Sequence, residues 1–191
     1  MKTEPDPNPR SQLPTPISQP AFTEKTALAF FTRHLDELKW KYHRNPDRPS
    51  LFSGYNGDNV LWDFNMTVRQ TSGGLFQLAV NSFIPNKALP PRRPAAMELL
   101  TRINFELALG CFEMNLVDGE IRFRTSAIIP GADITPGIVE HLVLSNLCIV
   151  EERFPQIMAV LYSGAPPANA MKPKESKPEP EVQPRFRFEL N

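Results

Sequence analysis

The sequence predicts an α+β domain in which an antiparallel sheet carries helices on one face. Three observations predict it. Strands and helices do not alternate singly along the chain, which argues against a doubly wound parallel sheet. Several segments alternate apolar and polar residues, as strands with one buried face do. Prolines gather at the two ends of the chain, so the domain lies between them. The expected order of elements is α-β-β-β-α-β-β-α.

Proline marks the boundaries of this domain. Six of the 21 prolines lie in residues 1–22, and another six lie in residues 165–191. These segments bury too little apolar area to offset the cost of ordering a chain, which is about 1–2 kcal/mol per residue. We therefore expect a domain at residues 23–164 between two disordered Pro-rich tails, 1–22 and 165–191.

The first helix is expected to begin after Thr23, whose hydroxyl group can cap it. Apolar residues then recur at the helical spacings of four, four, three and four: Ala27, Phe31, Leu35, Leu38 and Tyr42. The segment 45–49, which contains two prolines, is expected to end the helix.

Three strands are expected next. A short strand covers 51–53 and is closed by a turn at 54–59. From Val60 the alternation is regular, with Trp62, Phe64, Met66 and Val68 on one face and Asp63, Asn65, Thr67 and Arg69 on the other. The segment 71–74 is typical of a hairpin turn, and 75–84 is the returning strand.

The second half of the domain is expected to start with a helix from Pro94 to Gly110. Two strands, 111–117 and 120–129, follow and are joined through Asp118-Gly119, a strong hairpin signal.

A last helical region is expected to begin at Thr135. Proline lacks an amide N–H and clashes with the preceding turn, so we expect Pro155 to kink this helix or divide it. Gly164 closes the domain.

No residue pattern points to catalysis. His34 and His43 are expected on different turns of the first helix, and His141 lies early in the last one, so no pair has metal-ligand spacing. The sequence contains no HExxH, CxxC, GxSxG or GxxxxGK[ST] motif. Cys111 and Cys148 are expected to be reduced, because we find no signal peptide. We therefore expect no enzyme activity, no cofactor and no metal site.

Charge and hydropathy argue against two classes of partner. The chain has 21 basic and 21 acidic residues, balanced within each segment, whereas a nucleic-acid site needs clustered Lys and Arg. The longest apolar stretch, Ile138–Val150, is interrupted by polar residues and is too short to span a bilayer. We expect a cytoplasmic protein that binds neither nucleic acid nor membrane.

The polar face of the sheet is the remaining candidate site. Asp63, Asn65 and Arg69 share that face on one strand, and Arg122 and Arg124 share it on another. Arginines two residues apart can bind carboxylates in a bidentate manner. These five residues are our candidate partner-binding face. The alternative is an ordinary solvated sheet face.

The second half of the domain resembles a known family. The resemblance rests on four motifs in a fixed order: Ile103-Asn104, Gly110-x-Phe112, the hairpin run Asp118–Arg124, and Glu152-Arg153-Phe154-Pro155 continuing to Gly164. Together they resemble the bacterial YbjN family, which is labelled a sensory-transduction regulator. The resemblance implies a fold similar to the class I type III secretion chaperones, small homodimers that hold partner proteins in extended form. It brings no catalytic residues. The long Pro-rich tails and the near-neutral domain depart from those relatives.

Two functions stay open. The first is a chaperone-like or regulatory homodimer that binds other proteins. The second is a small-ligand sensor with a pocket between helix and sheet, near Trp62, Phe64 and Arg124. The segment Arg185–Leu190 alternates charged and apolar residues. It could pair with a sheet edge, or it could be a frayed terminus.

Overall fold

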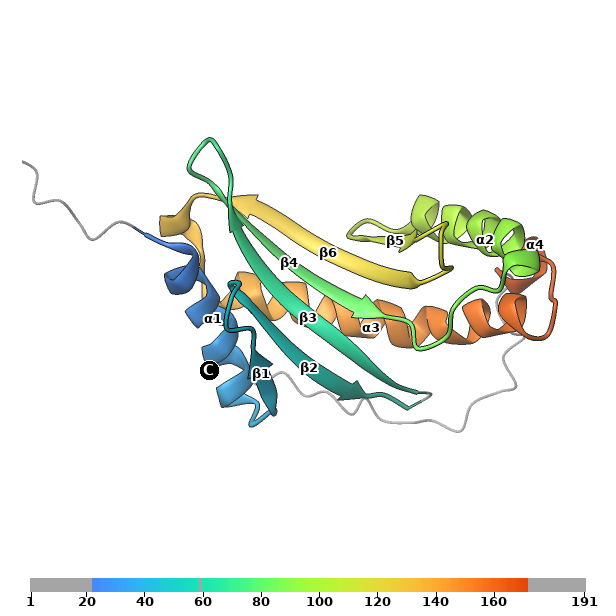
Figure 1. Cartoon of the computed structure of the whole chain (residues 1–191), viewed down its shortest axis with the longest axis horizontal. Helices are drawn as coiled ribbons and strands as arrows, with labels where there is room; N and C mark the ends of the chain where they lie inside the picture. Colours follow the sequence, from blue (N-terminus) through green and yellow to red (C-terminus); the bar gives the residue numbers. More distant parts are fainter. Residues whose placement is uncertain (1–21, 59, 172–191) are drawn as a thin grey trace, which may run out of the picture.

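The computed structural model describes residues 22–58 and 60–171. These residues form a six-stranded antiparallel sheet with helices packed against it, which confirms the expected α+β class (Figure 1). The helices are α1 (Glu24–Glu37), α2 (Arg93–Glu106), α3 (Pro136–Leu161) and the short α4 (Pro167–Ala170). The strands are β1 (Tyr42–Arg44), β2 (Ser50–Asn56), β3 (Leu61–Gln70), β4 (Phe76–Phe83), β5 (Cys111–Met114) and β6 (Ile121–Ile129).

The strands lie in the order β1-β2-β3-β4-β6-β5, and each neighbouring pair is antiparallel. The register aligns Phe52 with Asn65, Asn65 with Asn81, and Asn81 with Arg124. Side chains of paired residues point to the same face of a sheet. These four residues therefore form one row across the middle of the sheet.

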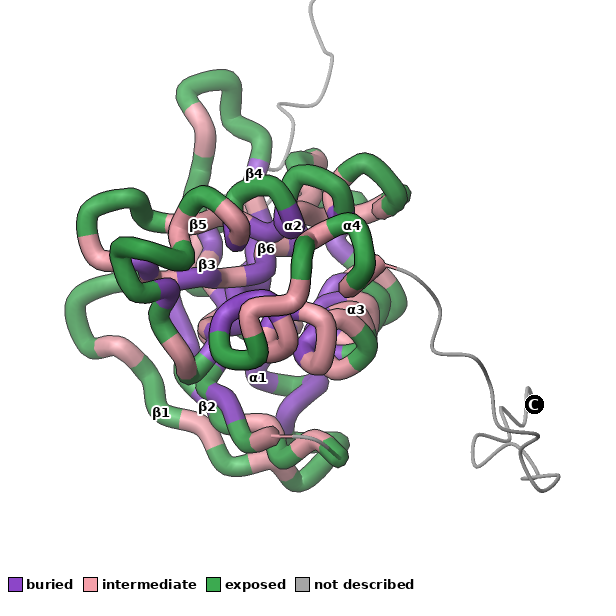
Figure 2. Tube along the Cα trace, turned by 90° about the vertical axis from the view of Figure 1, so that its right-hand side faces the viewer, coloured by how far each residue is buried: buried purple, intermediate pink, exposed green. Residues whose placement is uncertain are grey.

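Helices α1 and α3 cover one face of the sheet, with α3 running behind β4 and β6 (Figure 1). Figure 2 shows that the buried residues lie in the middle of the molecule, between the sheet and these helices. Burial of each large apolar side chain contributes about 1.5–3 kcal/mol. The largest fully buried side chains include Phe31, Leu35, Phe64, Met66, Leu78, Ile103 and Phe123.

A buried polar network joins α3 to the centre of the sheet. The Asn146 amide of α3 donates to the carbonyl oxygens of Val80 at 3.0 Å and Phe123 at 3.2 Å. Its Oδ1 accepts a hydrogen bond from the Ser82 hydroxyl at 2.5 Å. That hydroxyl in turn accepts from the Trp62 indole N–H at 3.0 Å. The network fixes where α3 crosses the sheet, because each buried polar group needs its partner.

Helix α2 does not cover the sheet face. It packs against α3 and β5, beside the edge of the sheet (Figure 1). Asn104 of α2 closes that edge, since its amide donates to the Phe112 carbonyl at 2.9 Å and its Oδ1 accepts from the Phe112 N–H at 2.7 Å. The side chain thus pairs with β5 as a neighbouring strand would.

The first helix is shorter than the sequence predicts. It ends at Glu37, and Tyr42 and His43 belong to β1, a strand that the predicted order lacks. Lys39 adopts a left-handed conformation with φ of 57° and turns the chain. Trp40 then packs against Tyr55 and Phe64, at 5.8 and 6.1 Å between ring centroids. This packing and the pairing of β1 with β2 outweigh the helical periodicity that continues through Leu38.

Other boundaries also differ from the predictions. Helix α2 ends at Glu106 instead of Gly110, because the backbone is already extended at Leu107, with ψ of 131°. Strand β2 continues through Asn56, into the range predicted as a turn, because Gly54 pairs with Asp63. Strand β5 ends at Met114 instead of 117. Helix α3 is continuous through Pro155, so Pro155 does not divide it, and the predicted kink stays a prediction.

The packed chain also continues beyond Gly164. Helix α4 contacts α2 and α3, and Ala170 and Met171 pack against the hydrophobic core. The rest of the two expected tails, residues 1–21 and 172–191, lies outside the described residues. The segment Arg185–Leu190 lies there too.

Candidate functional site

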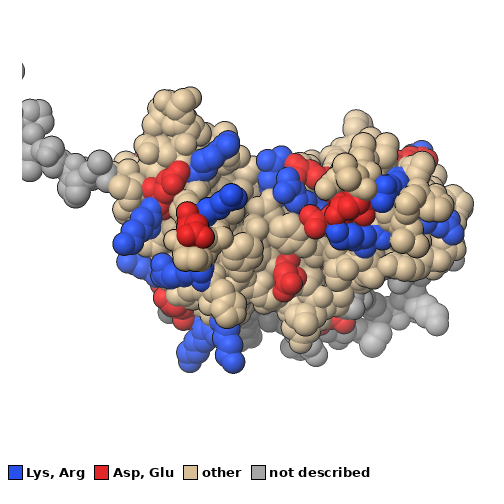
Figure 3. Space-filling model, viewed as in Figure 1, with Lys and Arg blue, Asp and Glu red and all other residues tan. Residues whose placement is uncertain are grey.

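The sheet face opposite α1 and α3 is covered by none of the described helices, and we call it the open face. Its side chains come from four neighbouring strands: Phe52, Asp63, Asn65, Thr67, Arg69, Gln77, Ala79, Asn81, Arg122 and Arg124. The middle of this face forms a broad, shallow hollow of about 620 Å³. Figure 3 views this face and shows basic side chains on both sides of a less charged central stretch.

The structure places all five predicted residues on the open face. Asn65, Arg69, Arg122 and Arg124 line the hollow. Asp63 lies on the same face of β3 but outside the hollow, beside Gly54. Strand alternation correctly predicted the side of the sheet for all five residues, and the strand order with β4 between β3 and β6 sets how far apart they lie.

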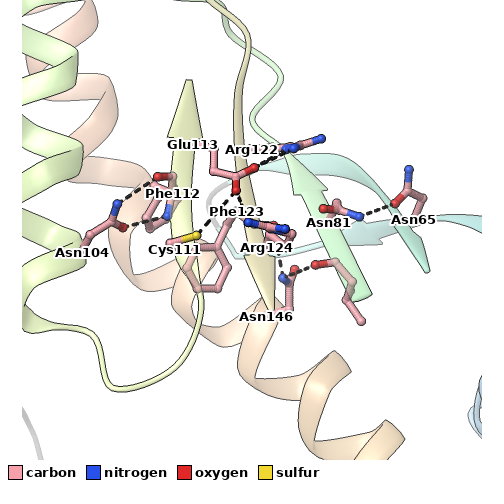
Figure 4. Close-up of polar contacts among 11 residues, drawn as sticks. Asn65, Asn81, Asn104, Cys111, Phe112, Glu113, Arg122, Phe123, Arg124 and Asn146 are labelled. Carbon is pink, nitrogen blue, oxygen red and sulfur yellow. Dashed lines mark hydrogen bonds and ion pairs between the residues drawn. The ribbon is translucent and has the colours of Figure 1, made fainter. Parts of the chain in front are cut away.

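A carboxylate that the sequence analysis missed holds the two arginines. Glu113 of β5 accepts hydrogen bonds at Oε2 from Nε of Arg122, at 2.7 Å, and at Oε1 from Nη2 of Arg124 (Figure 4). A second nitrogen of Arg122, Nη2, lies 2.7 Å from Oε2. The Cys111 thiol also points to this carboxylate, with Sγ 3.7 Å from Oε1. Both oxygens of Glu113 are therefore engaged by arginine.

The arginines also control the ionisation of Glu113. Partial burial alone raises the pKa of Glu113, but hydrogen bonds and positive charge from Arg122 and Arg124 outweigh it. Together they hold the pKa of this carboxyl below its ordinary value. Glu113 is therefore ionised at neutral pH and competes with any other anion for the two guanidinium groups.

The floor of the hollow is built from amides and one aromatic ring. Asn81, only 7% exposed, donates to Asn65 Oδ1 at 2.8 Å (Figure 4). Phe52 lies in the same row and is 41% exposed. Arg69 donates to Gln77 Oε1 at 3.0 Å. The hollow thus offers hydrogen-bonding groups and an apolar contact side by side.

In the described part of the chain, Trp62, Phe64 and Arg124 do not line one pocket between helix and sheet, where the second hypothesis placed the ligand. Trp62 and Phe64 are buried under the helices, where their side chains fill the space between helix and sheet. Arg124 points to the opposite face, since it alternates with the buried Phe123 and Thr125 on β6. That grouping was wrong because it mixed residues from the two faces of the sheet.

The histidines and cysteines are dispersed. His34 is buried on α1, and burial lowers its pKa against the opposing effect of nearby carboxylates. His43 lies on β1 and His141 is exposed on α3. Cys111 and Cys148 are free. Among the described residues, no cluster of three or more His, Cys, Asp or Glu side chains could hold a metal ion.

Helix α2 presents a second surface, which we call the α2 stripe and define as Met97, Thr101 and Phe105. The three residues are exposed and follow one another at intervals of one helical turn. Phe105 is 92% exposed, which is unusual for an aromatic side chain. Glu98 and Arg102 beside it form an ion pair of 2.8 Å and leave the stripe without net charge.

Comparison with models of protein families gives a match over much of the chain. Residues 30–157 match the model of the YbjN family, described as "putative bacterial sensory transduction regulator". No curated protein matches the chain. None of the helices in the described part of the chain is long and apolar enough to cross a membrane.

Proposed function

Because the chain belongs to the YbjN family, we propose that it is a regulatory module that binds another protein through the open face and catalyses no reaction. The family's description fits a regulatory role. The open face carries the proposal: it holds a wide hollow that is lined by polar groups and by the partly exposed ring of Phe52.

The dimensions of the hollow suit an extended polypeptide. It crosses four strands, from Phe52 on β2 to Arg124 on β6. Strands lie about 4.8 Å apart, so this width is roughly 14 Å, the length of four to five extended residues. Side-chain and backbone polar groups of a bound segment would meet the amides of Asn65 and Asn81.

The proposal includes a homodimer, for which the α2 stripe offers a symmetric contact. Met97 and Phe105 each lie four residues from Thr101. If two α2 helices cross antiparallel at Thr101, Met97 of each copy contacts Phe105 of the other copy. Two-fold interfaces need such a self-complementary surface. The small Thr101 at the crossing lets the helices approach. The chaperone-like character expected from the family resemblance belongs to this proposal too.

We also propose a cytoplasmic location. Cys148 is an exposed free thiol and Cys111 is a half-buried one. Free thiols persist in reducing compartments and tend to oxidise outside them.

Site-specific photocrosslinking in living cells tests the proposed face. A photoreactive residue replaces Thr67 on the open face or, as a matched control, the exposed His141 on α3. We expect discrete protein adducts from position 67 and none from position 141. Mass spectrometry of an adduct then identifies the partner. The absence of adducts at 67, or equal adducts from both positions, would refute the proposal.

A further inference from the structure

The arginine pair is only partly satisfied by Glu113. A guanidinium group has five N–H donors in a planar arrangement. The described hydrogen bond of Arg124 uses Nη2 alone, and that of Arg122 uses one edge of the group. Both arginine side chains keep over a third of their surface exposed, at 44% for Arg122 and 35% for Arg124. The remaining donors can therefore reach a second anion in the hollow.

The hollow as a whole carries excess positive charge. Its lining contains four arginines, at positions 48, 69, 122 and 124, and one carboxylate, Glu24. Glu24 is already engaged, since its Oε1 accepts the Gln70 N–H at 2.6 Å. Even with Glu113 included, positive charges outnumber negative ones by two. Because the whole chain is neutral, this excess is a local property of the hollow.

We infer that the open face binds an extended acidic segment of a partner protein, and that Glu113 is an internal competitor for Arg122 and Arg124. This inference rests on the proposed function and names the chemistry of the partner. A carboxylate of the partner binds the arginine pair and draws the guanidinium groups away from Glu113. The acidic segment binds more weakly than it would to the same arginines without Glu113, because some of the hydrogen bonds between Glu113 and the arginines have to break first.

The spacing of the arginines defines the segment further. In the sheet register Arg69 lies opposite Gln77, and Gln77 lies opposite Ile128, four residues along β6 from Arg124. Four residues and two strand spacings give a diagonal of about 16 Å. An extended chain covers that distance in about five residues. The two arginine sites therefore fit acidic residues that are about five positions apart.

The exposed ring of Phe52 and the small charge excess favour a polypeptide over a nucleic acid. Nucleic-acid binding depends on neutralising many phosphates, which takes a continuous basic surface. On the open face Asp63 and Glu113 interrupt such a surface. An acidic segment with apolar residues between its carboxylates matches both the arginines and Phe52.

The experiment measures binding of fluorescein-labelled hexaglutamate to the full-length protein by fluorescence anisotropy. Hexaglutamate is long enough to span both arginine sites. We expect binding that weakens with added salt. Arg122→Gln/Arg124→Gln should lower the affinity about tenfold or more, since a hydrogen bond to a charged group contributes about 1.5–3 kcal/mol. Glu113→Gln should raise it severalfold.

Arg102→Gln is the matched control, because Arg102 is an exposed arginine in an ion pair on α2, outside the hollow. It should leave the affinity unchanged. Arg69→Gln removes a charge of the hollow and only an exposed hydrogen bond to Gln77. It gives a second measurement of the same effect if the double variant does not fold.

Three binding results would overturn the inference, and so would one crosslinking result. The binding results are equal affinities for the Arg102→Gln and Arg69→Gln variants, a Glu113→Gln variant that binds hexaglutamate more weakly, and tighter binding of a single-stranded oligonucleotide than of hexaglutamate. Photocrosslinks from position 67 that persist in Arg122→Gln/Arg124→Gln would also overturn it. Such persistent crosslinks would leave the proposed function intact. The absence of crosslinks from position 67 in the otherwise wild-type protein would instead refute the proposed function.

Discussion

At the scale of single residues, Asn146 supports the fold more than any pattern in the sequence indicates. It is fully buried on α3 and bonds to groups on β4 and β6. The sequence shows Asn146 only as a polar residue within an apolar helical stretch, and this pattern does not indicate its hydrogen-bond partners. Only the crossing of α3 over the sheet supplies them.

Asn146→Ala should lower the free energy of unfolding by about 3 kcal/mol. The substitution leaves a cavity and removes the buried hydrogen-bond partner of Ser82. Urea denaturation followed by circular dichroism measures the loss. Ser145→Ala, at the neighbouring half-buried position, should change stability by about 0.5 kcal/mol or less. Equal losses in both variants would contradict the role of the network.

Glu113 shows what sequence reasoning could and could not find in the site. Alternation along a strand predicted the side of Asp63, Asn65 and Arg69 correctly. The contact of Glu113 with Arg122 depends on the register between β5 and β6, which pairs these two residues. A two-residue turn at Asp118-Gly119 would have paired Glu113 with Arg124 instead. Alignment of the two predicted strands would therefore have indicated that Glu113 lies close to the arginines.

The lowered pKa of Glu113 predicts a pH-dependent contribution to stability. Above pH 4.5, the ordinary value, Glu113 is ionised in both the folded and the unfolded chain, and its full contribution is present. As the pH falls below that value, the unfolded chain takes up the proton first, and the contribution is lost as the pH passes through the folded pKa. The difference in unfolding free energy between wild type and Glu113→Gln should therefore shrink as the pH falls.

Urea denaturation at a series of pH values between about 7 and 3 measures this difference. Glu98→Gln is the control, because Glu98 forms an exposed ion pair on α2, and such pairs contribute little to stability. A difference for Glu113→Gln that stays constant over the whole range would contradict the prediction.

At the scale of elements, both edges of the sheet are protected from pairing with another chain, one because its strand is short and the other because Asn104 covers it. Strand β1 is only three residues long, and Asn104 occupies the backbone groups of Phe112 on β5. Short or covered edges keep a sheet from pairing with other chains. The periodicity of α2 did not predict the role of Asn104, since a half-buried polar residue on a helix has many possible partners.

Asn104→Ala should lower the unfolding free energy by about 2 kcal/mol, because it leaves the N–H and the carbonyl of Phe112 without their partner. Glu98→Ala on the same helix removes only an exposed ion pair and should cost less than about 1 kcal/mol. Chemical denaturation compares the two. Similar costs would show that the edge contact is energetically unimportant.

A comparison of alanine substitutions at two turn glycines distinguishes the cost of backbone strain from the cost of a steric clash. Gly74 and Gly119 both have positive φ, of 78° and 81°. A Cβ on Gly74 would meet no atom within 4 Å, whereas a Cβ on Gly119 would lie 2.0 Å from the Ala88 carbonyl oxygen. Gly74→Ala should therefore cost about 1 kcal/mol, the strain alone. Gly119→Ala should cost several times more. Equal unfolding midpoints for the two variants would contradict the close approach of Ala88.

At the scale of the whole molecule, the fold class was predictable from the sequence because the apolar periodicities of strands and helices are local. The end of α1 was not. The apolar spacing continued through Leu38 to Tyr42, but the chain turns at Lys39 so that Trp40 can pack on Tyr55 and Phe64. Tertiary packing of this kind involves residues that are far apart in the sequence, and no local pattern reveals it.

The proposed dimer is a property of the whole molecule and has its own prediction. If two copies associate through the α2 stripe, unfolding is coupled to dissociation, and the melting temperature rises with protein concentration. A tenfold increase in concentration is worth about 1.4 kcal/mol per dimer, or roughly 2 °C for chains of this size. Phe105→Glu should abolish this dependence, because it places a charge opposite Met97 of the second copy.

Calorimetry over a hundredfold range of concentration measures the effect, and light scattering gives the mass in solution. Leu61→Glu is the matched control: Leu61 is also an exposed apolar residue, at 63%, but it lies on β3 away from α2. It should leave the concentration dependence intact. A monomeric mass for the wild-type protein at about micromolar concentration would refute the dimer. Loss of the dimer in Leu61→Glu, with Phe105→Glu still dimeric, would instead move the interface from α2 to the sheet.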